Sequence, residues 1–292
     1  MTQGTTSQIW GVLFVLPFLV LFVAFVVVPA LYAVWLSVVR WQPLGVSPFV
    51  GFYNYSKMLR DPIFWTALRN SFVYVLMVVP AGMVLALFTA VFIYSLRSSA
   101  LRQFFQSAFY LPGVVSALAV AIVWRYLFDN EIGLMNYILA LVGLPRLNWL
   151  GGLNTALPSI ALMSLIGGGG GAIIIFVAAL GGIPTELYDA ALIDGASALR
   201  KHFSITLPLL LPPILYVMVM GTIGAFQVFT PVYVLTHGGP LNRTMTVSFL
   251  IYRQIASYGD IAPAAATGML LVVACLGLTV AQFWWFSAVV EY

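Results

Sequence analysis

The sequence predicts an all-α membrane protein built as a bundle of six transmembrane helices, and three observations support this fold class. Hydrophobic residues make up 62% of the chain and charged residues only 7%, whereas a soluble domain is about 25% charged. The apolar residues gather in runs of the roughly 20 residues that a membrane-spanning helix needs. Ionisable side chains fall between those runs or near their ends. The lipid bilayer is therefore the expected surrounding of most of the chain.

The apolar runs divide the chain into six expected spans. They leave no room for a separate soluble domain, so we expect a single transmembrane domain over residues 1–292. The first run lacks the basic start of a secretory signal and is too long for one, so we expect it to be retained. Prolines inside the runs can be accommodated where neighbouring helices satisfy the carbonyl groups that they free. The expected spans cover about residues 10–36, 71–96, 108–128, 156–180, 209–230 and 262–289.

Two short stretches depart from this simple pattern. Residues 132–142, between the third and fourth spans, are expected to form a short helix at the membrane interface. Residues 167–171, inside the fourth span, are five consecutive glycines, and each costs about 1 kcal/mol relative to alanine in a helix interior. Two interpretations of the glycines stay open. They can allow a neighbouring helix to pack closely, or they can form an unwound turn that lines a solute path.

The positions of the polar residues argue against several classes of function. The eight acidic residues and both histidines lie outside the expected spans, so proton relays, metal sites and acid–base catalysis inside the bilayer are not expected. Lys57 and Lys201 follow no glycine-rich phosphate-binding sequence, so no nucleotide site is expected in this chain. Cys275 is the single cysteine and can form no internal disulfide. The absence of a basic run argues against a nucleic-acid partner. We therefore assign no catalytic residue, metal or cofactor to the chain.

The most specific pattern lies in the polar segment 181–208, between the fourth and fifth spans. Thr185 can cap a short helix whose positive end suits Glu186, and Gly195 can take the left-handed conformation that closes such a helix. A second short helix is expected to follow and to end at Pro208. Side chains three and four residues apart share one face of the first helix, and two alanines make part of that face flat. The four residues of this face are Leu187, Ala190, Ala191 and Asp194.

This segment resembles the EAA loop of permeases that belong to binding-protein-dependent ABC importers. The family pattern is Glu-Ala-Ala, three residues, Gly, nine residues, Ile, one residue and Leu-Pro. The chain departs from it only by an aspartate in place of the glutamate, and the matching residues are Asp189, Ala190, Ala191, Gly195, Ile205, Leu207 and Pro208. The resemblance implies a cytoplasmic coupling helix that sits in a groove of an ATPase subunit. Glu186, Leu187 and Asp194 would belong to the same coupling surface.

Further motifs resemble the carbohydrate-uptake branch of that family, in particular the first permease of maltose or glycerol-phosphate importers. They are FVGFYNY at 49–55, FYLP at 109–112, WRYLF at 124–128, GLMN at 133–136, NWLG at 148–151, FQVF at 226–229 and THGGP at 236–240. The resemblance implies a permease that pairs with a second, related permease and binds two copies of an ABC ATPase subunit, which would carry the ATP and Mg²⁺. An extracytoplasmic binding protein would deliver a sugar, or a related polyol or glycerol-phosphate solute.

The expected location is the cell (inner) membrane, and two observations disagree about the orientation. The family places the N-terminus and the coupling segment in the cytoplasm. The excess of basic residues in cytoplasmic loops that is typical of membrane proteins favours the opposite orientation. Arg97, Arg102, Arg200 and Lys201 would lie inside, whereas Arg40, Lys57, Arg60, Arg69, Arg146, Arg243 and Arg253 would lie outside. We give the coupling motif more weight, because an ATPase can bind only on the cytoplasmic side.

Candidate solute contacts are polar or aromatic residues in or beside the spans, because sugar sites combine hydrogen-bonding groups with aromatic faces. These candidates are Asn70, Tyr74, Ser116, Gln227 and Tyr233. Hydrogen bonding or packing between helices is the alternative role for each of them. Two other functions also stay open. The chain can be an importer permease for a non-sugar solute, or a sodium-driven secondary transporter that works without an ATPase.

Overall fold

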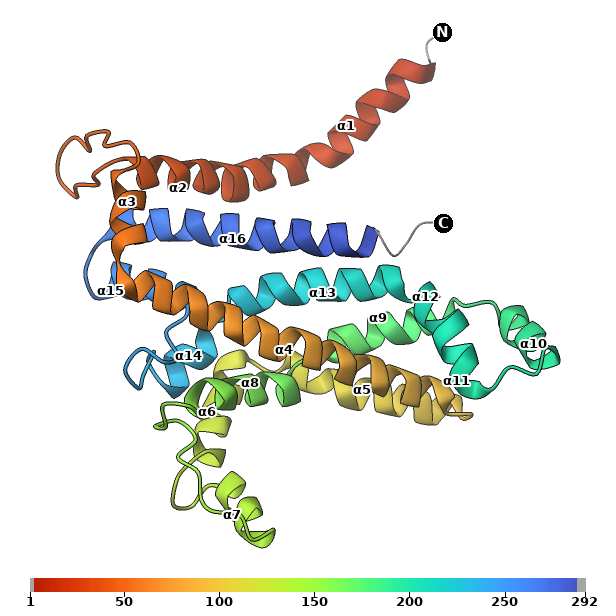
Figure 1. Ribbon diagram of the computed structural model, residues 1–292. Coiled ribbons are helices and arrows are strands. Elements are labelled where there is room, and N and C mark those ends of the chain that lie inside the picture. The colour runs from red at the N-terminus through yellow and green to blue at the C-terminus, as the bar shows by residue number, and fades with distance from the viewer. Residues whose placement is uncertain (1–2, 288–292) are drawn as a thin grey trace. The chain divides into compact units, whose positions relative to one another are not determined.

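The regular elements are all helices in residues 3–287, the part of the chain that the computed structural model describes (Figure 1). Four helices are long and apolar enough to cross a membrane, and the number rises to six if each of two bent helix pairs forms one span. The all-α class of a polytopic membrane protein is therefore confirmed, while six crossings stay a prediction. The chain forms two compact units. Unit one contains the residues up to Pro62 together with Ile251–Leu270, and unit two contains Ile63–Leu250 and the residues from Leu271 onward.

Unit one begins with a long apolar helix that is interrupted by one wide turn. Helix α1 (Gln3–Phe22) continues through a π-helical turn, η1 (Val23–Val27), into α2 (Val28–Val38). The N–H of Val28 donates to the carbonyl of Val23, five residues earlier, and Pro29 follows. Proline has no N–H, and its ring crowds the carbonyl four residues before it, so the wider turn accommodates the ring. The first predicted span lies within this continuous helix.

The rest of unit one contains α3 (Tyr53–Arg60) and parts of α15 (Val247–Ala256) and α16 (Ile261–Ser287). The buried amide of Asn54 on α3 donates to the carbonyls of Ser37 and Val39, each over 2.9 Å, and so ties α3 to the end of α2. The Nζ of Lys57 lies 3.7 Å from the carboxylate of Asp260. Both side chains of this ion pair are about half exposed, so the pair contributes little to stability.

Unit two is organised around α4 (Pro62–Ser95), α9 (Gly170–Gly181) and α13 (Leu211–Phe226), and α4 crosses the other two in Figure 1. Between them lies a buried apolar cluster, called the core cluster below. Its members are Ala86, Ala90, Ile93, Ile173, Phe176, Val177, Leu180, Ile183, Leu210 and Ile214. Helix α5 (Ser99–Val114) packs along α9. This cluster fixes the positions of the helices that surround the cavity described below.

The third predicted span, at residues 108–128, is not a single helix, and whether the bent pair crosses the membrane once stays a prediction. The segment belongs to two helices, α5 (Ser99–Val114) and α6 (Ala117–Leu127), which are bent by 91° at their junction. Pro112 removes one backbone donor near the end of α5. The N–H of Val115 then donates to the carbonyl of Pro112, three residues earlier. Val115 and Ser116 have ψ angles of 141° and 128°, which belong to extended chain and not to a helix. The chain therefore leaves the helix at these two residues and turns sharply.

Other boundaries differ less. The second long helix, α4, begins at Pro62, well before the expected residue 71. The short helix expected at residues 132–142 is present as α7 (Leu134–Leu141). The fifth run ends as α13 at Phe226, and a separate α14 (Thr230–Leu235) follows. The last expected span, residues 262–289, corresponds to α16, and its residues 288–289 lie outside the described part of the chain.

Candidate functional site

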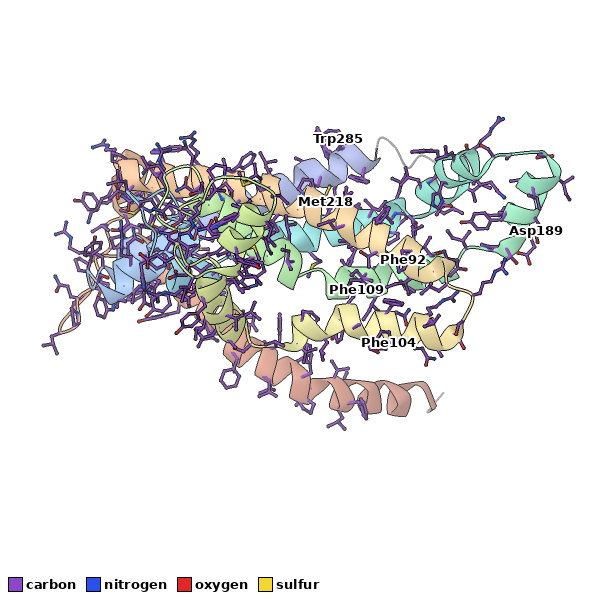
Figure 2. All side chains as sticks on the ribbon, turned by 90° about the horizontal axis from the view of Figure 1, so that it is seen from below. Phe92, Phe104, Phe109, Asp189, Met218 and Trp285 are labelled. Carbon is purple, nitrogen blue, oxygen red and sulfur yellow. The ribbon has the colours of Figure 1, made fainter. Side chains whose placement is uncertain are left out.

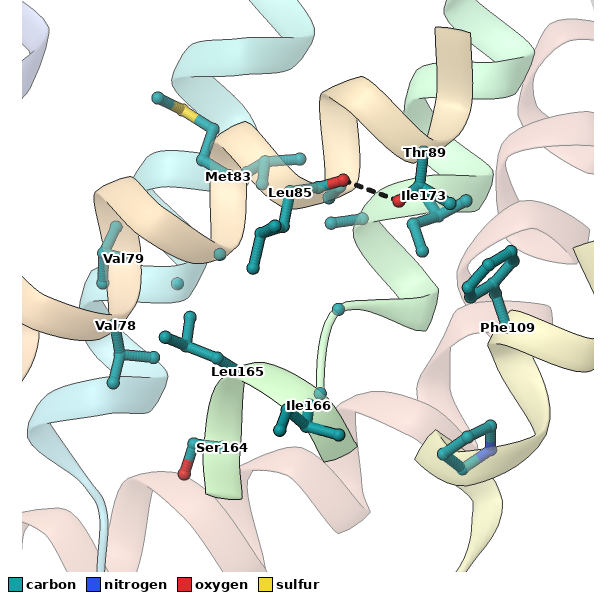
Figure 3. A pocket seen from close by; sticks show the side chains of 18 residues that line it. Val78, Val79, Met83, Leu85, Thr89, Phe109, Ser164, Leu165, Ile166 and Ile173 are labelled. Atoms are coloured by element: carbon teal, nitrogen blue, oxygen red, sulfur yellow. Dashed lines mark hydrogen bonds between the residues drawn. The ribbon is translucent and has the colours of Figure 1, made fainter. Parts of the chain in front are cut away.

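A cavity of about 380 Å³ lies inside unit two, among α4, α5, α8 (Ala156–Gly167), α9 and α13 (Figure 3). Its wall is mainly apolar. The hydroxyl of Thr89 donates to the carbonyl of Leu85 over 2.7 Å, within its own helix (dashed line in Figure 3). Among the described residues that line the cavity, none has an ionisable side chain. The lining residues are Val78, Val79, Gly82, Met83, Leu85, Ala86, Thr89, Phe109, Pro112, Ser164, Leu165, Ile166, Gly168, Gly169, Ala172, Ile173, Val217 and Gly221.

The glycine run breaks the fourth span beside this cavity. Helix α8 ends at Gly167, α9 begins at Gly170, and the two helices are bent by 47°. Gly169 has a φ of +92°, which side-chain-bearing residues rarely adopt. A Cβ at Gly168 would lie 2.5 Å from the carbonyl oxygen of Ser164. The interpretation as an unwound turn is therefore correct for Gly168 and Gly169.

The same run also allows close helix packing, at a different glycine. A Cβ at Gly170 would lie 2.8 Å from the carbonyl oxygen of Phe109 and 2.9 Å from the Cα of Tyr110. Both atoms belong to the backbone of α5, so α9 approaches α5 as closely as only a glycine permits. At Gly171, by contrast, a Cβ would meet nothing within 4 Å. Close packing and an unwound turn are thus both present in the run, at neighbouring residues, while a solute path beside the turn stays a prediction.

The five candidate solute contacts do not gather at the cavity, and none of them lines it. The buried amide of Asn70 donates to the carbonyls of Asn242 (2.8 Å) and Met245 (3.0 Å) and so holds a loop. Tyr74 is also buried, and its hydroxyl lies 2.6 Å from the hydroxyl of Ser164, which does line the cavity.

The other three candidates lie at helix ends or on a short helix. Ser116 is exposed at the sharp bend between α5 and α6. Gln227 is exposed where α13 ends. Tyr233 stacks on Phe229 with 5.5 Å between the ring centroids. Among the features singled out in the sequence, the glycine run lies at the cavity, and the residue types expected of a sugar site do not.

The segment 181–208 forms a second candidate site, at the end of unit two beyond α4, α5 and α13 (Figures 1 and 2). Helix α10 (Thr185–Ile193) has no buried residue, and Figure 2 shows Asp189 on this exposed helix. Leu187, Leu192 and Ile193 are exposed although they are apolar. On a short helix outside the candidate membrane spans, exposed apolar side chains are typical of a surface that another protein covers.

The end of α10 has the predicted geometry. Gly195 has a φ of +71°. Its N–H donates to the carbonyl of Leu192, and the N–H of Ala196 donates to the carbonyl of Ala191. These two bonds form the Schellman motif, in which a left-handed residue closes a helix. The sequence predicted this turn correctly from the single glycine.

Two details of the same segment were predicted wrongly. Thr185 does not cap α10 but is its first helical residue. Pro184 occupies the cap position with a ψ of 129°, and no side chain bonds to the start of the helix. The second helix does not end at Pro208 either. It consists of α11 (Ala198–Lys201), a π-helical turn η2 (His202–Thr206) and α12 (Leu207–Leu209), and it leads into α13. As at Pro29, a wide turn precedes the proline and makes room for its ring.

The remaining coupling candidates divide into exposed and packed residues. Glu186, Asp189 and Pro208 are exposed. Ile205 and Leu207 pack against the core cluster. Ala191, Asp194 and Ile205 are brought together at a cavity of about 230 Å³ between α10 and the helix that follows, with Arg200 and Lys201 also in its wall. In the described part of the chain, no three His, Cys, Asp or Glu residues are placed to hold a metal ion.

A polar contact joins α10 to the following helix, and the sequence analysis did not foresee it. The hydroxyl of Tyr188 lies 2.8 Å from the hydroxyl of Thr206. The Nδ1 of His202 lies 3.2 Å from the same threonine oxygen. His202 and Thr206 are four residues apart, which signals a possible contact on a helix, but no local pattern announces that Tyr188 joins them.

Comparison with known proteins agrees with this geometry. Residues 79–288 match the family model described as binding-protein-dependent transport system inner membrane component. The probable ABC transporter permease protein YesP of Bacillus subtilis is 33% identical over 268 residues, which are 90% of this chain and 85% of that protein. The sn-glycerol-3-phosphate transport system permease protein UgpA of Yersinia pestis is 33% identical over 285 residues, which are 96% of this chain and 95% of that protein.

A solved structure shares the fold. It is the crystal structure of a bacterial ABC transporter involved in the import of the acidic polysaccharide alginate. The matched chain superposes with a TM-score of 0.80 at 23% sequence identity, over 99% of this chain and 98% of that one.

Proposed function

The chain belongs to the family of inner membrane components of binding-protein-dependent transport systems, and on that premise we propose that it is a permease subunit of an ATP-driven importer. With a second, related permease it forms the translocation path for a sugar, or for a related polyol or glycerol-phosphate solute. The observation that carries the proposal is the match of the EAA pattern to an exposed helix, α10, that is closed by a left-handed glycine.

Segment 181–208 is proposed to bind the ATPase. Apolar side chains of its helix α10, Leu187, Leu192 and Ile193, are exposed. The small cavity beside α10 carries both a carboxylate, on Asp194, and basic groups, on Arg200 and Lys201. Such a surface can accept apolar and charged side chains of a partner. Two ATPase copies would bind, one on each permease, and would hold ATP and Mg²⁺ and perform the hydrolysis. This assignment puts the coupling segment and the N-terminus in the cytoplasm.

The cavity at the helix break is proposed to be this chain's part of the solute path. Irregular backbone inside a membrane is tolerated where it is buried in protein or lines a water-filled cavity, and Gly168 and Gly169 lie at such a place. The solute class rests on the relatives named for sn-glycerol-3-phosphate transport. An extracytoplasmic solute-binding protein is the remaining partner; a solved complex of the alginate transporter contains such a periplasmic protein.

A co-purification experiment tests the coupling segment. The complex is isolated from membranes through a tag on this chain, and the bound ATPase is quantified for the unaltered chain and for Gly195→Asp and Asp189→Lys. The first change forces a side chain into a left-handed conformation, and the second reverses an exposed charge. We expect each to lower the bound ATPase about tenfold, the factor that corresponds to about 1.4 kcal/mol of binding free energy.

The matched control is Glu131→Lys, which reverses another exposed charge but lies between α6 and α7. It should leave the bound ATPase unchanged. If the unaltered chain binds no ATPase, the coupling assignment is wrong, and uptake by the isolated chain in a sodium gradient becomes the decisive measurement. ATP-driven uptake of an amino acid or peptide, without uptake of any sugar, polyol or glycerol phosphate, would contradict the solute class alone.

A further inference from the structure

Few contacts hold helix α10 to the rest of unit two. None of its residues is buried. Among its described side chains, Tyr188 is the one that packs against the core cluster, in the company of Ile205 and Leu207. The chain enters α10 after Gly181 and Gly182 and leaves it through Gly195, which are residues that restrict the backbone least. Ile183 of the core cluster anchors the chain just before α10, and within α10 itself Tyr188 is the described side chain that fixes the helix to the rest of unit two.

The hydroxyl of Tyr188 is bonded to a fixed partner. Thr206, whose hydroxyl lies 2.8 Å away, is only 3% exposed. A threonine hydroxyl can donate one hydrogen bond and accept two, so it can bond to Tyr188 and to His202 at the same time. The second bond orients the threonine hydroxyl, because His202 lies one turn away on the same helical segment. The contact between α10 and the next helix is therefore directional as well as apolar.

Thr206 connects this contact to the cavity. The π-helical turn that contains it leads through α12 into α13, where Leu210 and Ile214 belong to the core cluster and are 1% and 5% exposed. Farther along α13, Val217 and Gly221 line the cavity. Thr206 and the cavity wall are thus joined by one closely packed helical segment, and closely packed protein interiors resist compression.

We propose that the pair Tyr188–Thr206 is a positioning contact that transmits movement of the coupling helix to the cavity. Both residues act through α13 and touch neither solute nor nucleotide. The proposal rests on the proposed function, because it needs an ATPase that moves α10. It goes beyond that function by assigning the transmission to a single hydroxyl pair outside the EAA pattern, with His202 as the group that orients it.

Thiol labelling in the cavity measures the transmission directly. The reporter chain carries Cys275→Ser, which removes the native thiol, and Thr89→Cys, which places a new thiol in the cavity wall. The complex with its co-purified ATPase is labelled with N-ethylmaleimide, with and without Mg·ATP and vanadate. In the reporter chain, we expect the nucleotide to change the labelling rate at position 89. Tyr188→Phe should reduce this change about fivefold, the factor that matches one hydrogen bond of about 1 kcal/mol.

Three further variants separate transmission from folding and docking. Thr206→Val should act like Tyr188→Phe, whereas Thr206→Ser keeps the hydroxyl and should behave as the reporter chain does. Tyr216→Phe on α13, where Tyr216 is 55% exposed, removes a tyrosine hydroxyl elsewhere and should have no effect. In each variant the amount of bound ATPase and its basal rate of ATP hydrolysis are measured in the same preparation, and the labelling change is compared per bound ATPase. Tyr216→Phe, which lies outside segment 181–208, should leave both within about twofold of the reporter chain.

The possible failures are distinct. If no ATPase co-purifies with the reporter chain, the proposed function fails. If the ATPase is bound and the nucleotide changes labelling equally in the reporter and Tyr188→Phe chains, the positioning contact is refuted. It is refuted as well if the bound, active ATPase never alters labelling at position 89, because then no movement reaches the cavity. Loss of the ATPase in Tyr188→Phe would show that the tyrosine serves docking and not transmission.

Discussion

Replacing Gly170 by alanine is expected to force α9 away from α5. The new Cβ would lie 2.8 Å from the carbonyl oxygen of Phe109 and 2.9 Å from the Cα of Tyr110, several tenths of an ångström closer than ordinary van der Waals contact. Both obstacles are backbone atoms, so no side-chain rotation relieves the clash. Overpacking of this kind costs about 1–3 kcal/mol. Because Gly170 begins α9, the helix propensity gained by alanine offsets only a part of that cost.

The neighbouring glycine supplies the matched control. At Gly171 a Cβ meets nothing within 4 Å, so Gly171→Ala should leave packing unchanged and gain up to about 1 kcal/mol of helix propensity. The two variants have the same composition and differ by one position. Any difference between them therefore measures the contact of α9 with α5.

The assay is the melting temperature of the purified protein in detergent, read from the fraction that remains monodisperse after heating. A cost of about 2 kcal/mol corresponds to a fall of about 4–8 °C for a chain of this size class. Gly170→Ala should show this fall, and Gly171→Ala should melt at or slightly above the unaltered protein. Equal melting temperatures for the two alanine variants would refute the close approach of α9 to α5 as a stabilising contact.

Two more variants test polar contacts outside the cavity. Asn70→Leu removes the amide that donates to two carbonyls of the loop before α15. An unsatisfied buried carbonyl costs about 1–3 kcal/mol, so a protease should cut this loop faster in Asn70→Leu than in the unaltered protein. The control is Asn130→Leu, whose amide is exposed and whose loss should not change the rate of cleavage. Asp129 accepts bonds from the backbone N–H groups of Ile132 and Glu131, and these bonds, that of Ile132 first, lower the pKa of its carboxyl. A lowered pKa means that the ionised form stabilises the fold above the unfolded-state pKa of about 3.9 and that this contribution is lost as the pH falls through the lower folded-state value. The melting temperature of the unaltered protein should therefore fall as the solution is acidified, and it should fall less in Asp129→Asn. An equal fall in both proteins would contradict the assignment.

Features that depend on nearby residues were predictable from the sequence. The turn at Gly195 needs only hydrogen bonds between residues five or fewer positions apart, so one glycine after a helical pattern was sufficient to predict it. The low helix propensity of glycine made a break in the fourth span one of two open interpretations, and the sequence alone did not decide between them. The bend inside the third predicted span could not be predicted, because its composition is apolar throughout and does not distinguish one long helix from two helices joined by a bend.

Contacts between distant residues could not be predicted. Asn70 has the chemistry of a sugar contact, but its amide is occupied by a loop more than 170 positions away. Tyr74 was selected for the same reason, yet it is its partner Ser164, 90 positions away, that reaches the cavity. No sequence pattern indicates that Tyr188 connects α10 to Thr206 of the following helix. Residue type indicates what a side chain can bind, whereas the fold decides which partner it meets.

Both helix breaks of unit two lie at the cavity. Phe109 and Pro112 come from the end of α5, just before the 91° bend, and Gly168 and Gly169 form the break between α8 and α9. Each break leaves backbone groups without helical partners, and hydrocarbon cannot satisfy such groups. Placing both breaks at one cavity lets water or a solute satisfy them together. The wall is otherwise mainly apolar, with Phe109 as its aromatic residue and no amide side chain among the described residues that line it, so the backbone groups freed by the two breaks supply much of its polarity.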